Sequence, residues 1–323
     1  MSGKRTFVVL AVVGVLAAGA GAWHRHGHVL SSRAAVGLAS AELPVFFAGG
    51  VEMIAHVSQD NDAFTRPIAP RELDAAEGPE HYFDLELLGG EPVPPTRYEF
   101  IEFCAAHHLK PPQVGLLPYA ITEWTQRLTV AFAEHRRWPD DPAVQVKCLV
   151  YAGLLAHYAA DACQPLHTTI HWDGRARQDG SSPRSGIHGR VDALPAKLGV
   201  TCAELIEGAK AEAFSDVMIA AVGEIQRSHA LVERVYELEG QLPAMESDEP
   251  LTDEGSAFAR ERMRAAAVFT ASLYLTAWRD SAKIEIPDWH RNFGAGNQPG
   301  GPAVLRAAGR GRTRAASQPA EPQ

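Results

Sequence analysis

The sequence is poor in positive charge. Its 30 Lys and Arg are outnumbered by 39 Asp and Glu, so the formal net charge is −9. A protein that grips duplex nucleic acid over a broad face needs clustered cationic side chains to neutralise phosphates. The composition therefore argues against such a face. Any phosphate chemistry would need its positive charge from another source, such as bound metal ions.

Cysteine and methionine are also scarce. The 323 residues include 4 Cys and 5 Met, against 14 His. The cysteines are too widely spaced for a zinc knuckle, and the sequence does not choose among their possible pairings. Histidine is the commonest neutral metal ligand, so its surplus is the feature of the composition that most needs an explanation.

The first 22 residues have the pattern of an export signal. Two basic residues precede an apolar run at 7–18, and Ala-Gly-Ala at 20–22 offers the small residues that signal peptidase prefers. The run is shorter than the span of about 20 residues that a membrane helix needs, although an uncleaved anchor is the alternative. Cleavage after residue 22 would make Trp23 the N-terminus and place the protein in the periplasm or the medium.

Helical periodicity dominates the rest of the chain. Apolar spacing predicts helices over the ranges 27–40, 42–57, 98–108, 118–137, 142–162, 202–238 and 253–280. No alternation of period two persists, so we expect an all-α fold with a single mainly helical domain. The helix at 142–162 is apolar nearly all round, which predicts that it is central and buried.

The segments between the helices complete this plan. Residues 60–96 are rich in Pro, Gly and acidic residues and predict a long structured loop region, and residues 174–186 predict an exposed loop. From residue 293 the composition of Gly, Pro, Ala, Ser and Gln predicts a disordered tail. The predicted organisation is a signal peptide at 1–22, a helical domain at 23–292 and a tail at 293–323.

Histidine and aspartate recur at one spacing in two places. His157 and Asp161 are four residues apart on the predicted core helix, so both side chains project from one face. His188 and Asp192 repeat the spacing directly after the polar loop. Either pair alone would suit an ordinary hydrogen bond. An unpaired carboxylate in a core helix is costly and a metal ion removes that cost, so the two pairs together predict a metal centre.

The residues around these pairs add further candidate ligands. Pro165 should end or kink the core helix, which leaves His167 in a turn beside the centre. Upstream, His81 lies in the segment His-Tyr-Phe-Asp, and the acidic segment before it offers Asp60, with Asp62 as the alternative.

From Trp23 to about Asp192, these motifs resemble the S1/P1 nuclease and zinc-dependent phospholipase C superfamily. In that family, signal cleavage exposes a tryptophan whose α-amino nitrogen and carbonyl oxygen bind zinc, and a histidine ligand follows shortly after. Trp23 and His28 match these two positions. A free α-amino group is a good ligand only after cleavage, so export and metal loading would be coupled.

The resemblance implies three zinc ions. The first would be held by Asp60, His81, His157 and Asp161. The second would be held by the backbone of Trp23, by His28 and by the bridging Asp161. The third would be held by His167, His188 and Asp192. None of these ligands is Cys, and nitrogen and oxygen ligands with positions open to water are typical of catalytic zinc.

The activity that the resemblance implies is phosphodiester hydrolysis. A hydroxide held by two close zinc ions would attack phosphorus, and Asp60 would orient it. Tyr82, beside His81, matches a family position that stacks a base of single-stranded nucleic acid.

The branch of the superfamily is decided by smaller features. The short spacing from Trp23 to His28 and the use of Asp192, where the phospholipases have glutamate, favour a nuclease acting on single-stranded nucleic acid. Ala160 and Cys163 depart from the usual motif. A phospholipase acting on phosphatidylcholine-like membrane lipid is therefore the alternative. An exported zinc-binding protein without catalysis is the alternative from another class.

Overall fold

The computed structural model describes residues 23, 25–65, 69–287 and 290. Within these ranges the regular elements are α-helices and short 3-10 helices, and the only β-type pairings are two isolated bridges. All the helices lie in the unit formed by residues 1–284. The prediction of an all-α fold is confirmed. The predicted signal peptide and tail fall outside the described residues.

The bounds of the elements are as follows. The α-helices are α1 (Arg25–Ala39), α2 (Val45–Gly49), α3 (Val51–Val57), α4 (Asp60–Phe64), α5 (Arg71–Glu77), α6 (Arg97–Ala106), α7 (Pro111–Val114), α8 (Leu117–Arg137), α9 (Pro142–Asp161), α10 (Ile187–Asp192), α11 (Leu194–Lys197), α12 (Cys202–Ile206), α13 (Val217–His229), α14 (Val232–Leu238) and α15 (Asp253–Ser281). The 3-10 helices are η1 (Gly78–His81), η2 (Leu85–Leu88), η3 (Pro165–Thr168) and η4 (Glu239–Gln241).

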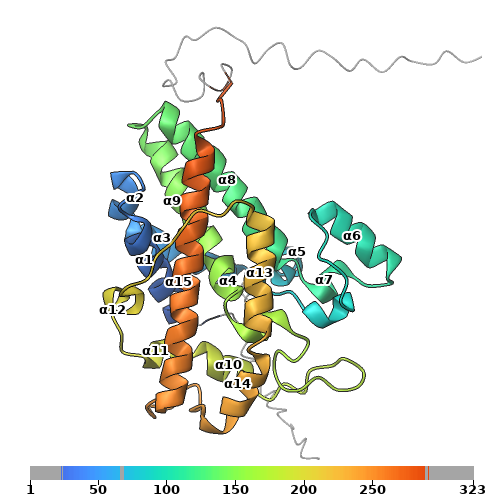
Figure 1. Cartoon of the computed structure of the whole chain (residues 1–323). Helices are drawn as coiled ribbons and strands as arrows, with labels where there is room; N and C mark the ends of the chain where they lie inside the picture. The colour runs from blue at the N-terminus through green and yellow to red at the C-terminus, as the bar shows by residue number, and fades with distance from the viewer. Residues whose placement is uncertain (1–22, 24, 66–68, 288–289, 291–323) are drawn as a thin grey trace, which may run out of the picture. The chain divides into compact units, whose positions relative to one another are not determined.

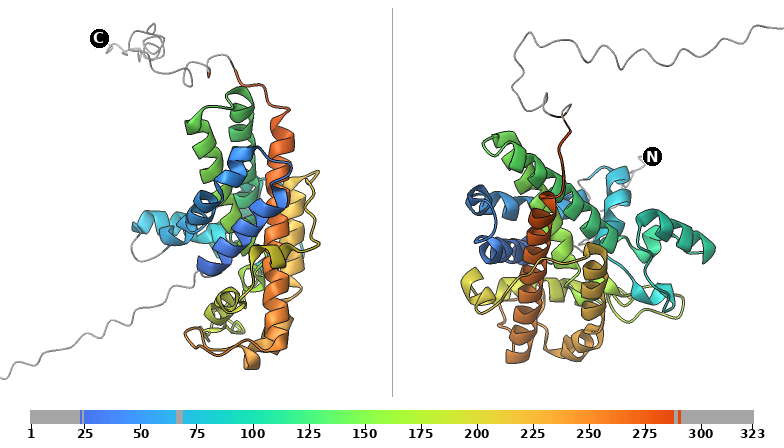
Figure 2. Two further views of the ribbon diagram at one scale, coloured as in Figure 1. Left: turned by 90° about the vertical axis from the view of Figure 1, so that its left-hand side faces the viewer. Right: turned by 45° about the horizontal axis from the view of Figure 1, so that its top comes forward.

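Four long helices form the core. The helix α9 packs against α1, α8 and α15, and α1 and α8 both pack against α15. In Figures 1 and 2, α15 (orange) runs along the length of this bundle, while α6 and α7 lie to one side of it. The second half of α9 is buried almost without interruption, as its apolar composition predicted. The core therefore surrounds the helix that carries the first His–Asp pair.

The composition of α9 also meets the length and hydropathy requirements of a membrane span. It is the one helix among the described residues that does so, and 61% of the qualifying window is buried inside the fold. A core helix of a soluble protein passes the same test, so this property reflects the central position of α9.

The starts of the long helices follow local chemistry. Pro142 occupies the first turn of α9, and the Asp141 side chain accepts a hydrogen bond from the backbone N–H of Ala143. Thr252 caps α15 in the same way. Such caps satisfy backbone donors that have no partner inside the helix. The predicted helices at 118–137, 142–162 and 253–280 are confirmed to within one residue at each end.

Three other predictions of secondary structure are wrong. The segment 42–57 is two helices, α2 and α3, separated at Gly50, where a Cβ atom would lie 2.4 Å from Leu149 Cδ1 of α9. The segment 60–96 is not a loop throughout, because it contains two short α-helices and two 3-10 helices. In both segments, Gly and Pro divide the chain into short helices and do not exclude helical structure altogether.

The predicted helix at 202–238 is divided into α12, α13 and α14. Gly208, with φ of 67°, follows the end of α12. The chain then runs beside α15, where the backbone N–H groups of Glu212 and Phe214 donate to the side chains of Ser272 and Thr276. In this stretch, hydrogen bonds to α15 side chains therefore take the place of the backbone hydrogen bonds that a helix would form.

All four cysteines are free. Cys104, Cys148 and Cys163 are buried, Cys202 is partly exposed, and the structure pairs none of them. The fold is therefore held together by packing and not by disulfide bonds.

Candidate metal centre

Three groups of buried histidine and aspartate side chains lie at one end of α9. They are His28–Asp62–His157, His81–His157–Asp161 and His167–His188–Asp192, and within each group the candidate ligand atoms lie within 4.8 Å of one another. The first two groups share His157. The ligands come from α1, α4, η1, α9, η3 and α10, so the centre exists only because packing brings these elements together.

The α9 pair lies in the middle of the centre. His157 and Asp161 are wholly buried, and His157 Nε2 is 3.3 Å from Asp161 Oδ2. The Nδ1–H group of His157 donates to the carbonyl oxygen of Ser58 at 2.8 Å. Because a carbonyl only accepts, this bond fixes the tautomer and directs the Nε2 lone pair toward Asp161.

Asp161 connects two sides of the centre. Its Oδ1 atom is 3.5 Å from His28 Nε2, and its Oδ2 atom is 3.0 Å from His81 Nδ1. The rings of His28 and His157 stack with centroids 3.9 Å apart. One carboxylate thus presents different oxygens to different histidines, which is the arrangement expected of a ligand that bridges two metal ions.

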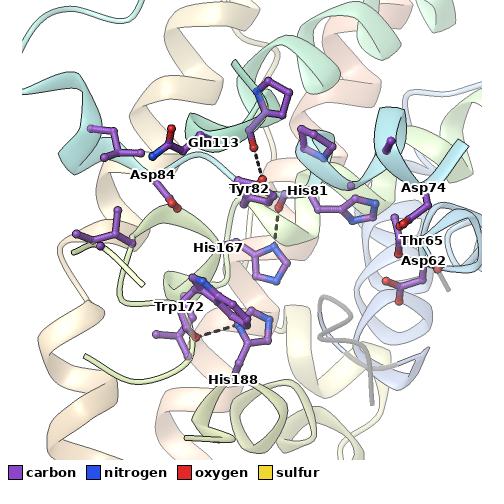
Figure 3. Close-up of a pocket in the computed structure, with 18 of the residues that line it drawn as sticks. Asp62, Thr65, Asp74, His81, Tyr82, Asp84, Gln113, His167, Trp172 and His188 are labelled. Atoms are coloured by element: carbon purple, nitrogen blue, oxygen red, sulfur yellow. Dashed lines mark hydrogen bonds between the residues drawn. The ribbon is translucent and has the colours of Figure 1, made fainter. Parts of the chain in front are cut away.

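The third group has the same internal order. The Nδ1–H group of His167 donates to the carbonyl oxygen of His81 at 2.6 Å, and that of His188 donates to the carbonyl oxygen of Trp172 at 3.0 Å (Figure 3). His188 Nε2 lies 3.2 Å from Asp192 Oδ2. Both rings are held by backbone acceptors, so both Nε2 lone pairs are available to a metal ion.

The buried atoms of these groups show whether a metal ion suits them. Several have no hydrogen-bond partner among the described residues, namely His28 Nε2, Asp161 Oδ1, His167 Nε2, His188 Nε2 and Asp192 Oδ2. Burying unpartnered polar atoms is expensive, and native structures do it rarely. Two nitrogen or oxygen ligand atoms that each lie about 2.1 Å from a tetrahedral zinc ion are about 3.4 Å from one another. The separations of 3.0 to 3.5 Å quoted above agree with that value, so these residues could hold zinc.

The electrostatics of the groups suit metal binding. Burial lowers the pKa of His28 well below its usual range, and burial likewise lowers the pKa of His167. Burial by itself would raise the pKa of Asp161, but His157 and His167 together hold it well below its usual range. At neutral pH Asp161 is therefore ionised and His28 and His167 are neutral, which are the protonation states that bind zinc. Burial opposes protonation of His157, but Asp161 raises its pKa to about 9, so His157 must release a proton when zinc binds.

The structure distinguishes Asp60 from Asp62 as candidate ligands, a choice that the sequence did not decide. Asp62 is buried and lies with His28 and His157, whereas Asp60 is partly exposed and belongs to none of the three groups. Residues two apart on a helix point in nearly opposite directions, so α4 can turn only one of them toward the centre. Helical geometry excludes both from facing it at once, but the sequence does not fix the rotation of α4.

Trp23 lies beside the centre. Its side chain is wholly buried, and its indole N–H donates to the carbonyl oxygen of Ala160, the residue before Asp161, at 3.0 Å. A Cβ atom on Gly27 would lie 2.7 Å from Trp23 Cβ, so glycine is needed at this close approach. Zinc binding by the backbone of Trp23 stays a prediction, because residues 1–22 and 24 lie outside the described ranges.

A pocket of about 670 Å³ opens beside the centre. His81, His167 and His188 contribute to its wall, with the rings of Tyr82 and Trp172 on either side of His167 (Figure 3). Burial raises the pKa of Tyr82 to about 12, and its hydroxyl donates to the carbonyl oxygen of Pro112. The Tyr82 ring is thereby fixed at the pocket wall.

The charged residues that line this pocket are acidic. They are Asp62, Asp74, Asp84 and Asp179, and no Lys or Arg is found among the described residues that line it. Burial raises the pKa of Asp84 well above its usual range. Sequence reasoning gave Asp84 and Asp179 no role. The motif His-Tyr-Phe-Asp contained the signal for Asp84, but nothing local marked Asp179, which reaches the pocket from the loop at 174–186.

Comparisons with known proteins give limited additional information. No family model and no curated protein matches the chain. Among solved structures, the alpha toxin from Clostridium absonum covers 81% of this chain at 10% identity and a TM-score of 0.42. A Clostridium perfringens alpha-toxin from an avian strain covers 82% at 10% identity and a TM-score of 0.40. The chain spans 64% and 65% of these two structures. Similarity at this level assigns no family.

Proposed function

We propose that this protein is a zinc-dependent phosphodiesterase with three zinc ions in its active site. The observation that carries the proposal is the set of three buried His and Asp groups with unpartnered ligand atoms next to a pocket. Two ions would be held close together by His28, His81, His157 and Asp161, with Asp62 in place of Asp60. His167, His188 and Asp192 would hold the third.

Bound zinc would supply a Lewis acid and a water molecule of lowered pKa, which are the requirements of phosphate ester hydrolysis at neutral pH. The residues of the chain have separate tasks. Asp161 stays ionised in the interior and fixes the spacing of the ligands on both its sides. Asp62 lines the pocket, where its carboxylate can orient an attacking water and accept its proton.

Single-stranded nucleic acid is the substrate that we favour. Tyr82 and Trp172 present aromatic rings to the pocket beside His167 and His188, and base stacking on such rings depends little on sequence. The buried carboxyl group of Asp84 lines the same pocket, and its raised pKa would let it donate a hydrogen bond to a base. An unpaired strand can turn a base into a pocket, whereas a duplex keeps its bases stacked.

A phospholipid with a cationic headgroup is the second candidate. The observation that favours it is the acidic lining, because Asp74 and Asp179 would attract an ammonium group but repel the further phosphates of a polynucleotide. The faces of Tyr82 and Trp172 also attract cations. The chemistry at phosphorus would be the same for both substrates.

The proposal includes export and maturation. We infer that cleavage after residue 22 frees the α-amino group of Trp23 for metal binding in the periplasm or the medium. The support is the sequence pattern of the first 22 residues and the burial of the Trp23 side chain beside Asp161.

A hydrolysis assay tests the function. The protein beginning at Trp23 is incubated with single-stranded DNA and with phosphatidylcholine vesicles, each with and without a chelator, and zinc is then restored. We expect DNA cleavage that the chelator abolishes and zinc restores. Cleavage of lipid alone would select the second candidate. Zinc binding without turnover of either substrate would indicate a zinc-binding protein and contradict the proposal.

A further inference from the structure

Gln164 is a wholly buried amide between two parts of the metal centre. Its Oε1 atom accepts a hydrogen bond from the backbone N–H of Leu166 at 2.6 Å, and its Nε2 atom donates to Asp192 Oδ1 at 2.8 Å. The backbone also takes part, because Gln164 N–H donates to the carbonyl oxygen of Asp161, and His167 N–H donates to that of Gln164, each at 3.0 Å. One residue thus contacts three segments that carry ligands.

Only an amide satisfies both side-chain contacts. If the group were reversed, its NH₂ would face the N–H of Leu166 and its oxygen would face the Asp192 carboxylate. Glutamate has no donor unless it is protonated, and an aliphatic residue has neither donor nor acceptor. The amide orientation follows from the backbone N–H, whose role as a donor is fixed.

The contact determines what Asp192 can offer to a metal ion. Oδ1 is occupied by Gln164, whereas Oδ2 is buried without a hydrogen-bond partner among the described residues and lies 3.2 Å from His188 Nε2. A carboxylate held in this way binds through a single oxygen with a fixed direction. Outer partners of this kind tune the affinity of a metal site.

We infer that Gln164 is a positioning residue that fixes Asp192 as a one-oxygen ligand and thereby sets the affinity of the third zinc ion. This inference rests on the proposed function, since it assumes that zinc binds. It goes further by assigning to one amide the control of the third ion, independently of the ions at Asp161.

The test is a zinc titration of Gln164→Glu against a competing chelator, with bound metal counted by mass spectrometry. We expect tight zinc to fall from three equivalents to two, with the third binding about 10- to 100-fold more weakly. Gln145→Glu is the matched control, because Gln145 lies at the opposite end of α9 from His157 and Asp161 and its side chain donates to the carbonyl oxygen of Pro139. It should keep three. Unchanged affinities in Gln164→Glu would overturn the inference.

A double-mutant cycle shows whether Gln164 acts through Asp192. In an Asp192→Asn background, Gln164→Glu should change the affinity of the third ion little, because the carboxylate that it positions is gone. A full additional loss would show a general structural role instead and would also overturn the inference. If Gln164→Glu does not fold, Gln164→Met removes both bonds without burying a charge and takes its place.

The failures of the two proposals are distinguishable. A wild-type protein that binds no zinc would contradict the proposed function itself. A wild-type protein with three ions, and a Gln164 variant with the same three affinities, would contradict only the role of Gln164.

Discussion

Three histidines of the metal centre are oriented in the same way. The Nδ1–H groups of His157, His167 and His188 each donate to a backbone carbonyl oxygen, which leaves Nε2 facing the other ligands. The carbonyl acceptors belong to Ser58, His81 and Trp172, far away in sequence. Such bonds fix both the tautomer and the ring direction before metal arrives. The histidines are therefore preorganised, which reduces the cost of ordering them on binding.

The two aspartates of α4 give a prediction at this scale. Asp62→Asn should lower hydrolysis by about two orders of magnitude or more, on the scale of removed catalytic groups, and should weaken zinc binding. Asp60→Asn is the matched control and should behave as wild type, since Asp60 joins no ligand group. Hydrolysis rates and zinc counts measure both effects. The reverse result would show that α4 presents Asp60 instead.

The titration of His157 gives a second prediction. Burial by itself would lower its pKa, but Asp161 raises it to about 9 in the metal-free protein. A folded-state pKa above the unfolded value of about 6.5 means that this stabilisation is complete below pH 6.5 and is lost as the pH rises through 9. Burial by itself would also lower the pKa of His188, but Asp192 raises it above its usual value. The stabilisation from protonated His188 is therefore also lost as the pH rises.

We therefore expect the metal-free protein to lose thermal stability from pH 6.5 to 8.5. Zinc replaces the proton on His157, so the zinc-loaded protein should not show this loss. Melting temperatures measured with chelator and with zinc should diverge as the pH rises. His56→Gln, at an exposed histidine of α3, should follow wild type. A constant difference across this range would contradict the assignment.

At the scale of elements, the contact of α3 with α9 positions the centre. Gly153 of α9 faces α3 so closely that a Cβ atom would lie 2.6 Å from Val57 Cβ and 2.8 Å from the carbonyl oxygen of Ile54. Ser58 follows directly and accepts the hydrogen bond of His157. The spacing of two helices therefore determines the direction of one ligand.

Gly153→Ala should push these helices apart. We expect destabilisation of about 1–3 kcal/mol, as for other overpacked cores, together with weaker zinc binding because Ser58 moves. Gly37→Ala is the control. A Cβ atom there meets only Ile206 Cδ1 at 3.6 Å, so helix propensity should stabilise the protein by about 0.5–1 kcal/mol. Denaturant unfolding and zinc titration measure both. Equal zinc affinity in the two variants would contradict the coupling.

The accuracy of the helix predictions has a physical pattern. The bounds of α8, α9 and α15 followed from local periodicity, proline and caps, which act within a few residues. The prediction failed at 202–238, where α15 side chains bond the backbone between α12 and α13. It failed also at Gly50, where α2 ends before α3 begins and where the Leu149 side chain leaves no room for a Cβ atom. Contacts distant in sequence override a local pattern in both places.

At the scale of the whole molecule, maturation should control metal content. Protein that begins at Trp23 should bind three zinc ions, whereas one extra alanine before Trp23 should weaken one of them by blocking the α-amino group. Metal analysis after dialysis measures the count. The control carries the extra alanine after Gln323 and should retain all three. Equal zinc content in both extended proteins would contradict a backbone ligand at Trp23.

The sequence by itself determined the helical class and the spacing of the His–Asp pairs. His157 and Asp161 share a face because a helix turns every 3.6 residues, which is a local property. Only the tertiary structure decided which aspartate of α4 faces the centre, how Gln164 meets Asp192, and which residues surround the pocket. Those contacts depend on how distant helices pack, and packing is set by the whole core at once rather than by any one segment.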